Sequence, residues 1–280
     1  MAEGEILMAS VTEFCQSTND SDADWANVGN IRGTTGYALD SIPASNVGGT
    51  IVARNYYWTI PSNAVIDGVK VIIKKESNID DQIQDNVIRL LVDGSLVGDN
   101  KASATLWKNA VDTFEYGGAT DMWGLAEITP ADANASDFGF HLIAENTGSS
   151  TYAAIVWYVT MTIYYHIPIV APTVTTQAVD DIAKTTATGN GTITVTGGEN
   201  CTRRGFCYIV GTSGDPDTSD DVEYADGSFG TGAFDDLITG LLANTGYRVR
   251  AYAVNTAGTG YGVTVQLTTK ADFAARIYWL

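Results

Sequence analysis

The sequence predicts an all-β protein made of two consecutive β-sandwich domains, and three observations support this. Glycine is abundant (29 residues) and proline is scarce (6), a composition that suits short strands joined by glycine turns. No window longer than about ten residues keeps the apolar period of a helix. The proline-containing segment HIPIVAPTV interrupts the strand runs. We therefore expect an N-terminal arm or a loosely held first strand (1–24), a jelly-roll-like sandwich (25–166), a linker (167–172), a second sandwich (173–270) and a C-terminal tail (271–280).

Turn residues separate the strand runs of the first region. IVARNYYWTIP (51–61) is β-branched and aromatic and stops at Pro61, and VKVIIKK follows an expected turn at Asp67-Gly68. NVIRLLV (86–92) runs into Asp93-Gly94, and Asp-Gly between apolar runs is a strong hairpin signal. DFGFHLIAEN supplies a later strand, and ITPADANASDF (128–138) has room for one helical turn.

The apolar stretch AAIVWYVTMTIYYHIPIV (153–170) approaches the length of a membrane-spanning helix. Its residues alternate with period two, which favours a long strand with one buried face. We expect no membrane insertion. The side chains expected on the buried face are Ile155, Trp157, Val159, Met161, Ile163 and Tyr165.

The second region contains four further strand runs, GTITVT, RGFCYIV, YRVRAYAVN and YGVTVQLTT, at intervals that fit an immunoglobulin-like sandwich of about 100 residues. Tyr247 follows a turn that contains Leu241, the arrangement of a tyrosine corner, in which the phenol bonds back to nearby backbone. This segment resembles the fibronectin type III-like domains of bacterial and phage surface proteins, although Ala243 stands where those domains usually have proline. The matching residues are Gly240, Leu241, Thr245, Tyr247, Val249, Arg250, Ala251, Tyr252, Ala253, Asn255 and Gly262, together with Gly205, Phe206 and Tyr208.

The first region resembles a β-sandwich domain of bacteriophage and prophage structural proteins. The resemblance rests on Trp25 and on WTIPSNAVIDGVKVIIKK, YGGATDMWGLAEITPADANASDFGFHLIAEN and VWYVTMTIYY. It implies a head, fibre or appendage component and brings no active site with it.

The net charge of −18 makes nucleic acid an unfavourable partner, since the chain repels phosphate backbones. The N-terminus has no basic segment followed by a long apolar run, so we expect no signal peptide. Three cysteines without regular spacing argue against a disulfide framework and favour reduced thiols in a cytosol. Whether Cys201 and Cys207 pair across a bend stays open.

Few residues offer catalytic or metal chemistry, and we expect no cofactor. His141 and His166 lie in no nucleophile motif or zinc pattern. Glu115, Asp121 and Glu127 surround YGGATDMWG and are candidates for a glycoside hydrolase, which needs two carboxylates across a cleft. The alternative is a Gly117-Gly118 turn with Tyr116, Met122 and Trp123 packed over the sandwich end. Two acidic segments could hold calcium or lie exposed: DPDTSDD (215–221) and, more weakly, Asp80, Asp81 and Asp85.

Two groups of aromatic residues are candidate contact surfaces. The first region holds five of the six tryptophans, and Trp123 with Tyr116 is a candidate glycan platform, unless these rings fill the core. The tail ADFAARIYWL ends in Ile277, Tyr278, Trp279 and Leu280, candidate assembly contacts that otherwise fold back onto their own domain.

We therefore expect a non-enzymatic structural component of a bacteriophage virion, assembled in the host cytoplasm. Its expected partners are other capsid or tail proteins, further copies of itself and host surface glycans. The alternatives are a carbohydrate-binding adhesion protein that uses exposed tryptophans and, third, a glycoside hydrolase.

Overall fold

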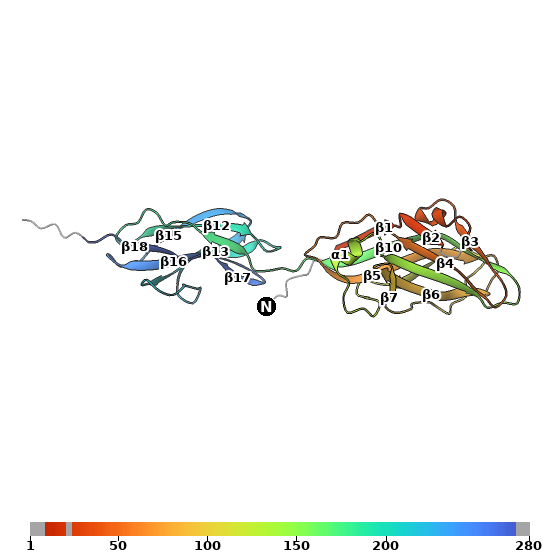
Figure 1. Ribbon diagram of the computed structural model, residues 1–280. Coiled ribbons are helices and arrows are strands. Elements are labelled where there is room, and N and C mark those ends of the chain that lie inside the picture. Colours follow the sequence, from red (N-terminus) through yellow and green to blue (C-terminus); the bar gives the residue numbers. More distant parts are fainter. Residues whose placement is uncertain (1–8, 21–23, 273–280) are drawn as a thin grey trace, which may run out of the picture. The chain divides into compact units, whose positions relative to one another are not determined.

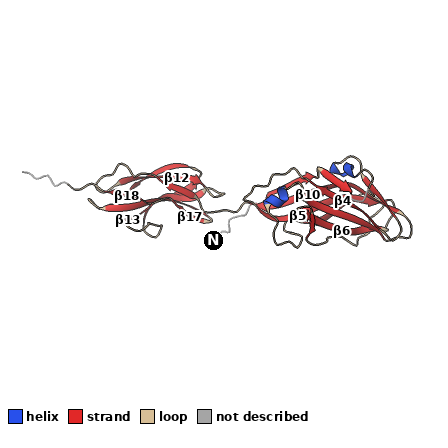
Figure 2. Cartoon of the chain, viewed as in Figure 1, coloured by secondary structure: helices blue, strands red, loops and turns tan. Residues whose placement is uncertain are grey.

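The computed structural model describes residues 9–20 and 24–272. The chain divides into two compact units between Pro168 and Ile169 (Figure 1). Both units are built of antiparallel strands, with only short helical turns in the described residues (Figure 2). Val170 already belongs to the second unit, because its backbone N–H donates to the Gly197 carbonyl. The linker expected over 167–172 is therefore shorter than predicted.

The first unit is a sandwich of two five-stranded sheets. One sheet, called the front sheet here, has the order β1-β10-β5-β8, with β3 also pairing with β10. The other, the back sheet, has the order β2-β4-β9-β6-β7. The front strands are β1 (Ala9–Phe14), β3 (Ala38–Ile42), β5 (Val65–Ser77), β8 (Asp112–Gly117) and β10 (Tyr152–His166). The back strands are β2 (Ser17–Asp20), β4 (Val47–Arg54), β6 (Ile83–Val92), β7 (Ser95–Val97) and β9 (Gly139–Asn146).

Local sequence signals account for several elements of this unit. The hairpin predicted at Asp93-Gly94 is confirmed: Val92 pairs with Ser95, and both loop residues have positive φ, 50° and 68°. The predicted helical turn is α1 (Pro130–Asn134), which begins with a capping box between Thr129 and Asp132. A second short helical element is the 3₁₀ turn η1 (Val28–Arg32).

For residues 9–20 the expected arm is wrong, and the alternative, a first strand, is confirmed. β1 pairs along its whole length with β10, and β2 pairs with β4. Cys15, between these strands, is completely buried. Their backbone groups complete the two sheets, so this segment is an integral part of the sandwich.

A β-bulge changes the phase of β10. Its register with β5 shifts between Val156 and Tyr158, so Trp157 is an extra residue in the strand. Val156 and Val159 are both buried, whereas Ile155 and Trp157 are partly exposed. The expectation that Ile155 and Trp157 share the buried face with Val159 was wrong, because strict alternation does not continue through a bulge. The expected turn at Asp67-Gly68 is also wrong, since both residues lie within β5.

The second unit is a fibronectin III-like sandwich of a three-stranded and a five-stranded sheet. The orders are β11-β12-β15 and β14-β13-β16-β17, with β18 also pairing with β16. The smaller sheet contains β11 (Thr173–Thr176), β12 (Ala187–Val195) and β15 (Gly232–Ile238). The larger contains β13 (Cys201–Val210), β14 (Asp221–Phe229), β16 (Gly246–Asn255), β17 (Gly258–Tyr261) and β18 (Val265–Thr268).

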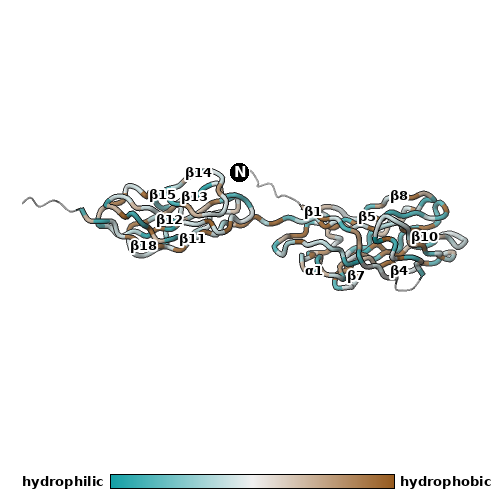
Figure 3. The backbone as a smooth tube through the Cα atoms, turned by 90° about the horizontal axis from the view of Figure 1, so that it is seen from above, coloured by the Kyte–Doolittle hydropathy of each residue, from teal (hydrophilic) through white to brown (hydrophobic). Residues whose placement is uncertain are grey.

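Apolar and polar residues are interspersed along the chain in both units (Figure 3). In β16, Tyr247, Val249 and Ala251 are buried in the core of the second unit. The Tyr247 hydroxyl accepts a hydrogen bond of 2.8 Å from the Leu242 N–H, and Leu241 beside it is 3% exposed. This bond ties the strand to the turn that precedes it.

All three cysteines are free and buried. Cys201 and Cys207 lie in one strand, β13, six positions apart. A strand advances about 3.3 Å per residue, so their Cα atoms are roughly 20 Å apart, well beyond the reach of a disulfide. The two cysteines therefore cannot pair within one folded chain.

Candidate functional site

The glycan platform predicted at Trp123 and Tyr116 is wrong, because both side chains are buried, with exposed fractions of 0% and 6%. The loop after β8 folds back onto β5, where the Trp123 indole N–H donates to the Val69 carbonyl at 2.8 Å. Gly68 makes this possible, since a Cβ there would lie 2.3 Å from the Gly118 carbonyl oxygen. Rings enclosed in this way cannot stack on a sugar.

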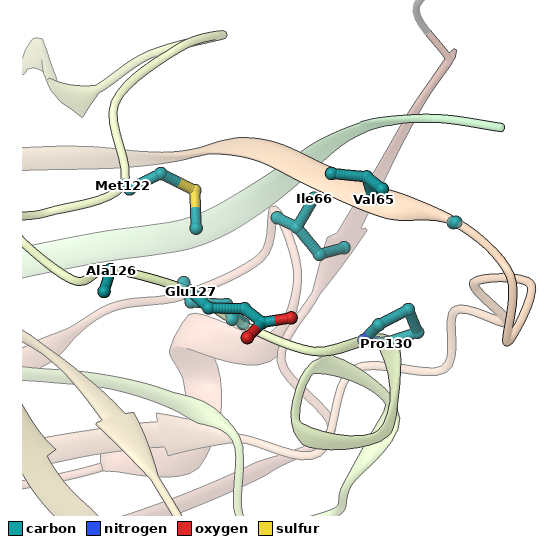
Figure 4. A pocket seen from close by; sticks show the side chains of 8 residues that line it. Val65, Ile66, Met122, Ala126, Glu127 and Pro130 are labelled. Carbon is teal, nitrogen blue, oxygen red and sulfur yellow. The ribbon is translucent and has the colours of Figure 1, made fainter. Parts of the chain in front are cut away.

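The three carboxylates considered for glycoside hydrolysis have separate surroundings. Glu115 on β8 is exposed and pairs with Lys70 at 3.6 Å, and Asp121 pairs with Lys101 at 2.7 Å. Glu127 lies on the wall of a pocket of about 310 Å³ and is the one acidic residue that lines it (Figure 4). Most of the other lining residues are apolar, among them Ile66, Met122 and Pro130. This pocket therefore offers one carboxylate and not the pair that the reaction needs.

The acidic segments considered for calcium are held by contacts within the protein. Asp215 pairs with Arg248 at 2.8 Å, and Asp217 accepts hydrogen bonds from the backbone and side chain of Ser219. Within residues 9–20 and 24–272, no group of three or more His, Cys, Asp or Glu side chains could hold a metal ion. The tail residues Ile277, Tyr278, Trp279 and Leu280 lie outside the described residues. No described helix is long and apolar enough to cross a membrane.

Trp157 differs from the other tryptophans that the structure describes. Trp25, Trp58, Trp107 and Trp123 are buried, whereas Trp157 is partly exposed on the outer face of the front sheet. The bulge in β10 turns it outward, and its indole N–H donates to the Glu76 carboxylate at 2.9 Å. A β-bulge commonly re-aims a side chain in this way near a functional site.

Further aromatic and charged side chains continue this surface. The Tyr37 ring, 41% exposed, lies 5.1 Å from the Trp157 ring between centroids. Tyr158, the next residue along β10, also faces outward, with Phe14 at 5.8 Å and the Lys74 ammonium at 5.7 Å from its ring centroid. We call these residues the aromatic strip: Phe14, Tyr37, Lys74, Glu76, Trp157 and Tyr158.

The aromatic strip offers two kinds of contact on one sheet face. Its rings present apolar edges and faces, and Lys74 and Glu76 present a donor and an acceptor beside them. Both charged residues lie on β5, two positions apart, so they point to the same side of the sheet. Sequence alternation missed this surface because it placed Trp157 in the core, and neither Tyr37 nor Phe14 belonged to a recognised run.

A second cluster is completely enclosed between the two sheets of the first unit. The Lys75 ammonium on β5 contacts the Asp85 carboxylate on β6, and neither side chain has any exposed surface. The Tyr116 hydroxyl lies 2.5 Å from Lys75 Nζ and donates to Asp85 Oδ2 at 2.6 Å. The Trp107 indole N–H donates to Asp85 Oδ1 at 3.0 Å.

Burial shifts the pKa of Lys75 and of Tyr116 in this cluster. It lowers the pKa of the Lys75 ammonium to about 8, although the neighbouring Asp85 carboxylate opposes the change. Burial also raises the pKa of the Tyr116 hydroxyl far above its usual value, with a further contribution from Asp85. Tyr116 therefore remains a protonated hydrogen-bond donor throughout the ordinary pH range. Sequence reasoning considered Asp85 with Asp80 and Asp81 and overlooked Lys75 as its partner.

Comparisons with known proteins give no family for the chain: no protein-family model matches the sequence, and no curated protein matches it. Among solved structures, the sensor domain of the anti-sigma factor RsgI4 in Pseudobacteroides cellulosolvens matches with 14% identity and a TM-score of 0.29, over 37% of this chain and 99% of that one. The chicken CNTN1 FN1-FN3 domains match with 11% identity and a TM-score of 0.28, over 83% of this chain and 66% of that one. TM-scores this low carry no argument about fold or function, and the strand order and register define the fold.

Proposed function

We propose that the chain is a non-enzymatic structural component of a bacteriophage particle that works by surface contact. Two kinds of contact belong to this proposal: assembly with virion proteins or further copies of the chain, and attachment to a host surface glycan. The resemblance of both regions to phage structural and surface domains supports it. So does the architecture, in which two β-sandwich units present broad sheet faces.

The surroundings of the acidic residues favour surface contact over hydrolysis. Glu115 and Asp121 each have a lysine partner, and the pocket near α1 contains Glu127 as its single carboxylate. A glycosidase needs an acid and a second carboxylate on either side of one sugar bond. The Lys75–Asp85 pair lies inside the core and cannot touch a polymer. These features favour the outer surfaces as the parts that meet a partner.

The observation that carries the adhesive part is the outward position of Trp157. Aromatic rings stack on the apolar C–H faces of sugars, and the neighbouring Glu76 and Lys74 can bond to sugar hydroxyls. The Trp157–Glu76 hydrogen bond fixes the indole before a ligand arrives, which reduces the entropy lost on binding. The occupant that matches this chemistry is a saccharide with exposed C–H faces, such as an oligosaccharide of glucose or N-acetylglucosamine.

A glycan array tests the adhesive part. The full chain is expected to bind a defined set of glycans, and Trp157→Ala is expected to lose at least about tenfold in affinity, as for loss of a stacking contact of about 1.5 kcal/mol. Tyr224→Ala is the matched control, because Tyr224 is an exposed aromatic residue (46%) on the second unit. Binding by the wild type that Trp157→Ala leaves unchanged would contradict the assignment of the strip.

Light scattering over a range of concentrations tests the assembly part. The comparison is between the full chain and a chain that ends at Asp272, which keeps the Lys184–Asp272 ion pair and the backbone bonds of Lys270. A defined oligomer that becomes a monomer without residues 273–280 would support assembly through the tail. Monomers in both cases would remove self-association from the proposal and leave the glycan contact to be judged on the array.

A further inference from the structure

The buried cluster of the first unit brings an amine and a carboxylic acid together in the absence of solvent. Lys75 Nζ contacts Asp85 Oδ1, and the exposed fraction of both side chains is 0%. Lys75 belongs to the front sheet and Asp85 to the back sheet, so the contact crosses the core. The rings of Phe114, Trp107 and Tyr116 surround Nζ, with centroids at 4.1, 4.5 and 5.2 Å.

We propose that Lys75 and Asp85 form an intramolecular isopeptide bond spontaneously once the first unit has folded. The lone pair of the neutral Lys75 amine attacks the Asp85 carboxyl carbon, so that a C–N bond forms and one C–O bond breaks. The departing oxygen takes the carboxyl proton and one amine proton and leaves as water. The product is a secondary amide, and the reaction needs no oxidant, reductant or cofactor.

The neighbours of Asp85 suit each part of this reaction. The Tyr116 hydroxyl touches both Nζ (2.5 Å) and Oδ2 (2.6 Å), so it can pass a proton from the amine to the departing oxygen. The Trp107 indole N–H on Oδ1 stabilises the negative charge that develops on the oxygen that stays. The backbone N–H of Ser103 donates to Oδ2 at 3.2 Å and helps to fix the plane of the carboxyl group.

Burial favours the neutral form of the Lys75 amine, the form that attacks the carboxyl carbon. Isolating an ammonium group from water is costly, and the Lys75 side chain has no exposed surface. The low pKa of Lys75, which burial brings to about 8, reflects the same cost. The fold also holds the two groups in contact, which replaces an encounter by an intramolecular step. The surrounding rings stabilise the ammonium form as well, so a non-covalent ion pair is the competing state.

Mass spectrometry of the denatured full chain separates the two states. The proposal predicts a mass lower than that of the sequence by one water molecule. Lys75→Arg and Asp85→Ala are expected to have their full sequence masses, and freshly made Tyr116→Phe is expected to be mostly unreacted. Lys70→Arg is the matched control, because this lysine of β5 points outward and pairs with Glu115; it is expected to lose one water like the wild type.

Peptide mapping of the wild type identifies the residues from which water was lost, and it does not depend on whether the variants fold. An isopeptide bond blocks trypsin at Lys75 and leaves peptide 75–89 intact, and cleavage after Glu76 then leaves the two halves joined. A succinimide at an Asp-Gly pair, such as Asp93-Gly94, also loses one water, but it opens in hydroxylamine and maps elsewhere. A full sequence mass with cleavage after Lys75, or a water loss mapped to an Asp-Gly pair, would overturn the proposal.

Discussion

The indole N–H of Trp157 donates a hydrogen bond to the carboxylate of Glu76 across the β10–β5 pair, with 2.9 Å between Nε1 and Oε1. The bond exists because Trp157 is an extra residue in β10, at the bulge between Val156 and Tyr158. Without this residue Tyr158 would be the one outward aromatic side chain at this point of β10. The bulge thus places two aromatic side chains in succession on the outer face of the sheet.

Deletion of Trp157 is expected to preserve the first unit. Val156 pairs with Lys75 and Tyr158 with Lys74, so removing the residue between them leaves a regular ladder. We expect a loss of stability of about 1 to 2 kcal/mol, together with loss of glycan binding. Tryptophan fluorescence during urea unfolding measures the stability, since four of the five tryptophans that remain in this variant lie in this unit.

Deletion of Thr160 is the matched control, because it removes one residue from a regular part of the same strand. A one-residue shift turns every side chain on one side of the deletion to the opposite face. Val159 or Met161, both completely buried, would then face outward. This variant is expected to be unfolded, and equal stability of the two deletions would contradict the account of the bulge.

Tyr247→Phe is expected to destabilise the second unit by about 1 to 3 kcal/mol, because the Leu242 N–H loses its acceptor in a partly buried turn. Hydrogen exchange of the β16 amides measures this loss within the full chain. Tyr261→Phe in the same unit removes a hydroxyl that is hydrogen-bonded to Thr218 in exposed surroundings. This substitution is expected to change the free energy of unfolding by no more than about 0.5 kcal/mol. Equal effects of the two substitutions would argue against a special role of Tyr247.

Gly68→Ala is expected to lower the free energy of unfolding of the first unit by about 1 to 3 kcal/mol, as for overpacking in a core. Its Cβ would lie 2.3 Å from the Gly118 carbonyl oxygen and would push away the loop that buries Trp123. Gly33→Ala is the control, since a Cβ at Gly33 meets nothing within 4 Å. Tryptophan fluorescence reports both variants, and unaffected stability in Gly68→Ala would show that the loop does not depend on this close approach.

The cysteine thiols are expected to be unreactive in the folded chain. Burial raises the pKa of Cys15 and of Cys207 to about 12, although Arg32 and Arg250 respectively oppose this, and burial also raises the pKa of Cys201. The thiolate is the reactive form, so reaction with a disulfide reagent stays slow until the pH approaches these values. Reagent added at mildly alkaline pH is expected to label all three cysteines in denaturant and none without it. Rapid labelling of the folded chain would contradict the burial of these groups.

Much of the fold follows from local sequence patterns. Strand alternation, the Asp93-Gly94 hairpin and the turn before Tyr247 each depend on residues close together in the chain. The bulge at Trp157 does not, because it is a property of the pairing between β10 and β5 and interrupts the alternation that predicts strands.

The candidate sites were harder to predict than the strands. Trp123 was predicted to be exposed because the sequence does not show the loop that folds over β5, which the close approaches at Gly68 and Gly117 permit. In the sequence, Lys75 is one of two adjacent lysines, and nothing local distinguishes it from Lys74. Its position on the inner face, opposite Asp85 of the other sheet, depends on how the two sheets pack.

The central claim is that Trp157 forms part of a contact surface on the outer face of the front sheet. The most direct test is to label the tryptophans of the full chain isotopically and to titrate the protein with a saccharide. Soluble oligosaccharides of glucose and of N-acetylglucosamine are the probes, and Trp157→Phe assigns the Trp157 indole N–H signal. This signal is expected to shift on binding, while those of Trp107 and Trp123, which are bonded inside the core, stay unchanged. Binding that leaves the Trp157 signal in place, or no binding of any probe, would contradict the assignment of the aromatic strip as a saccharide site.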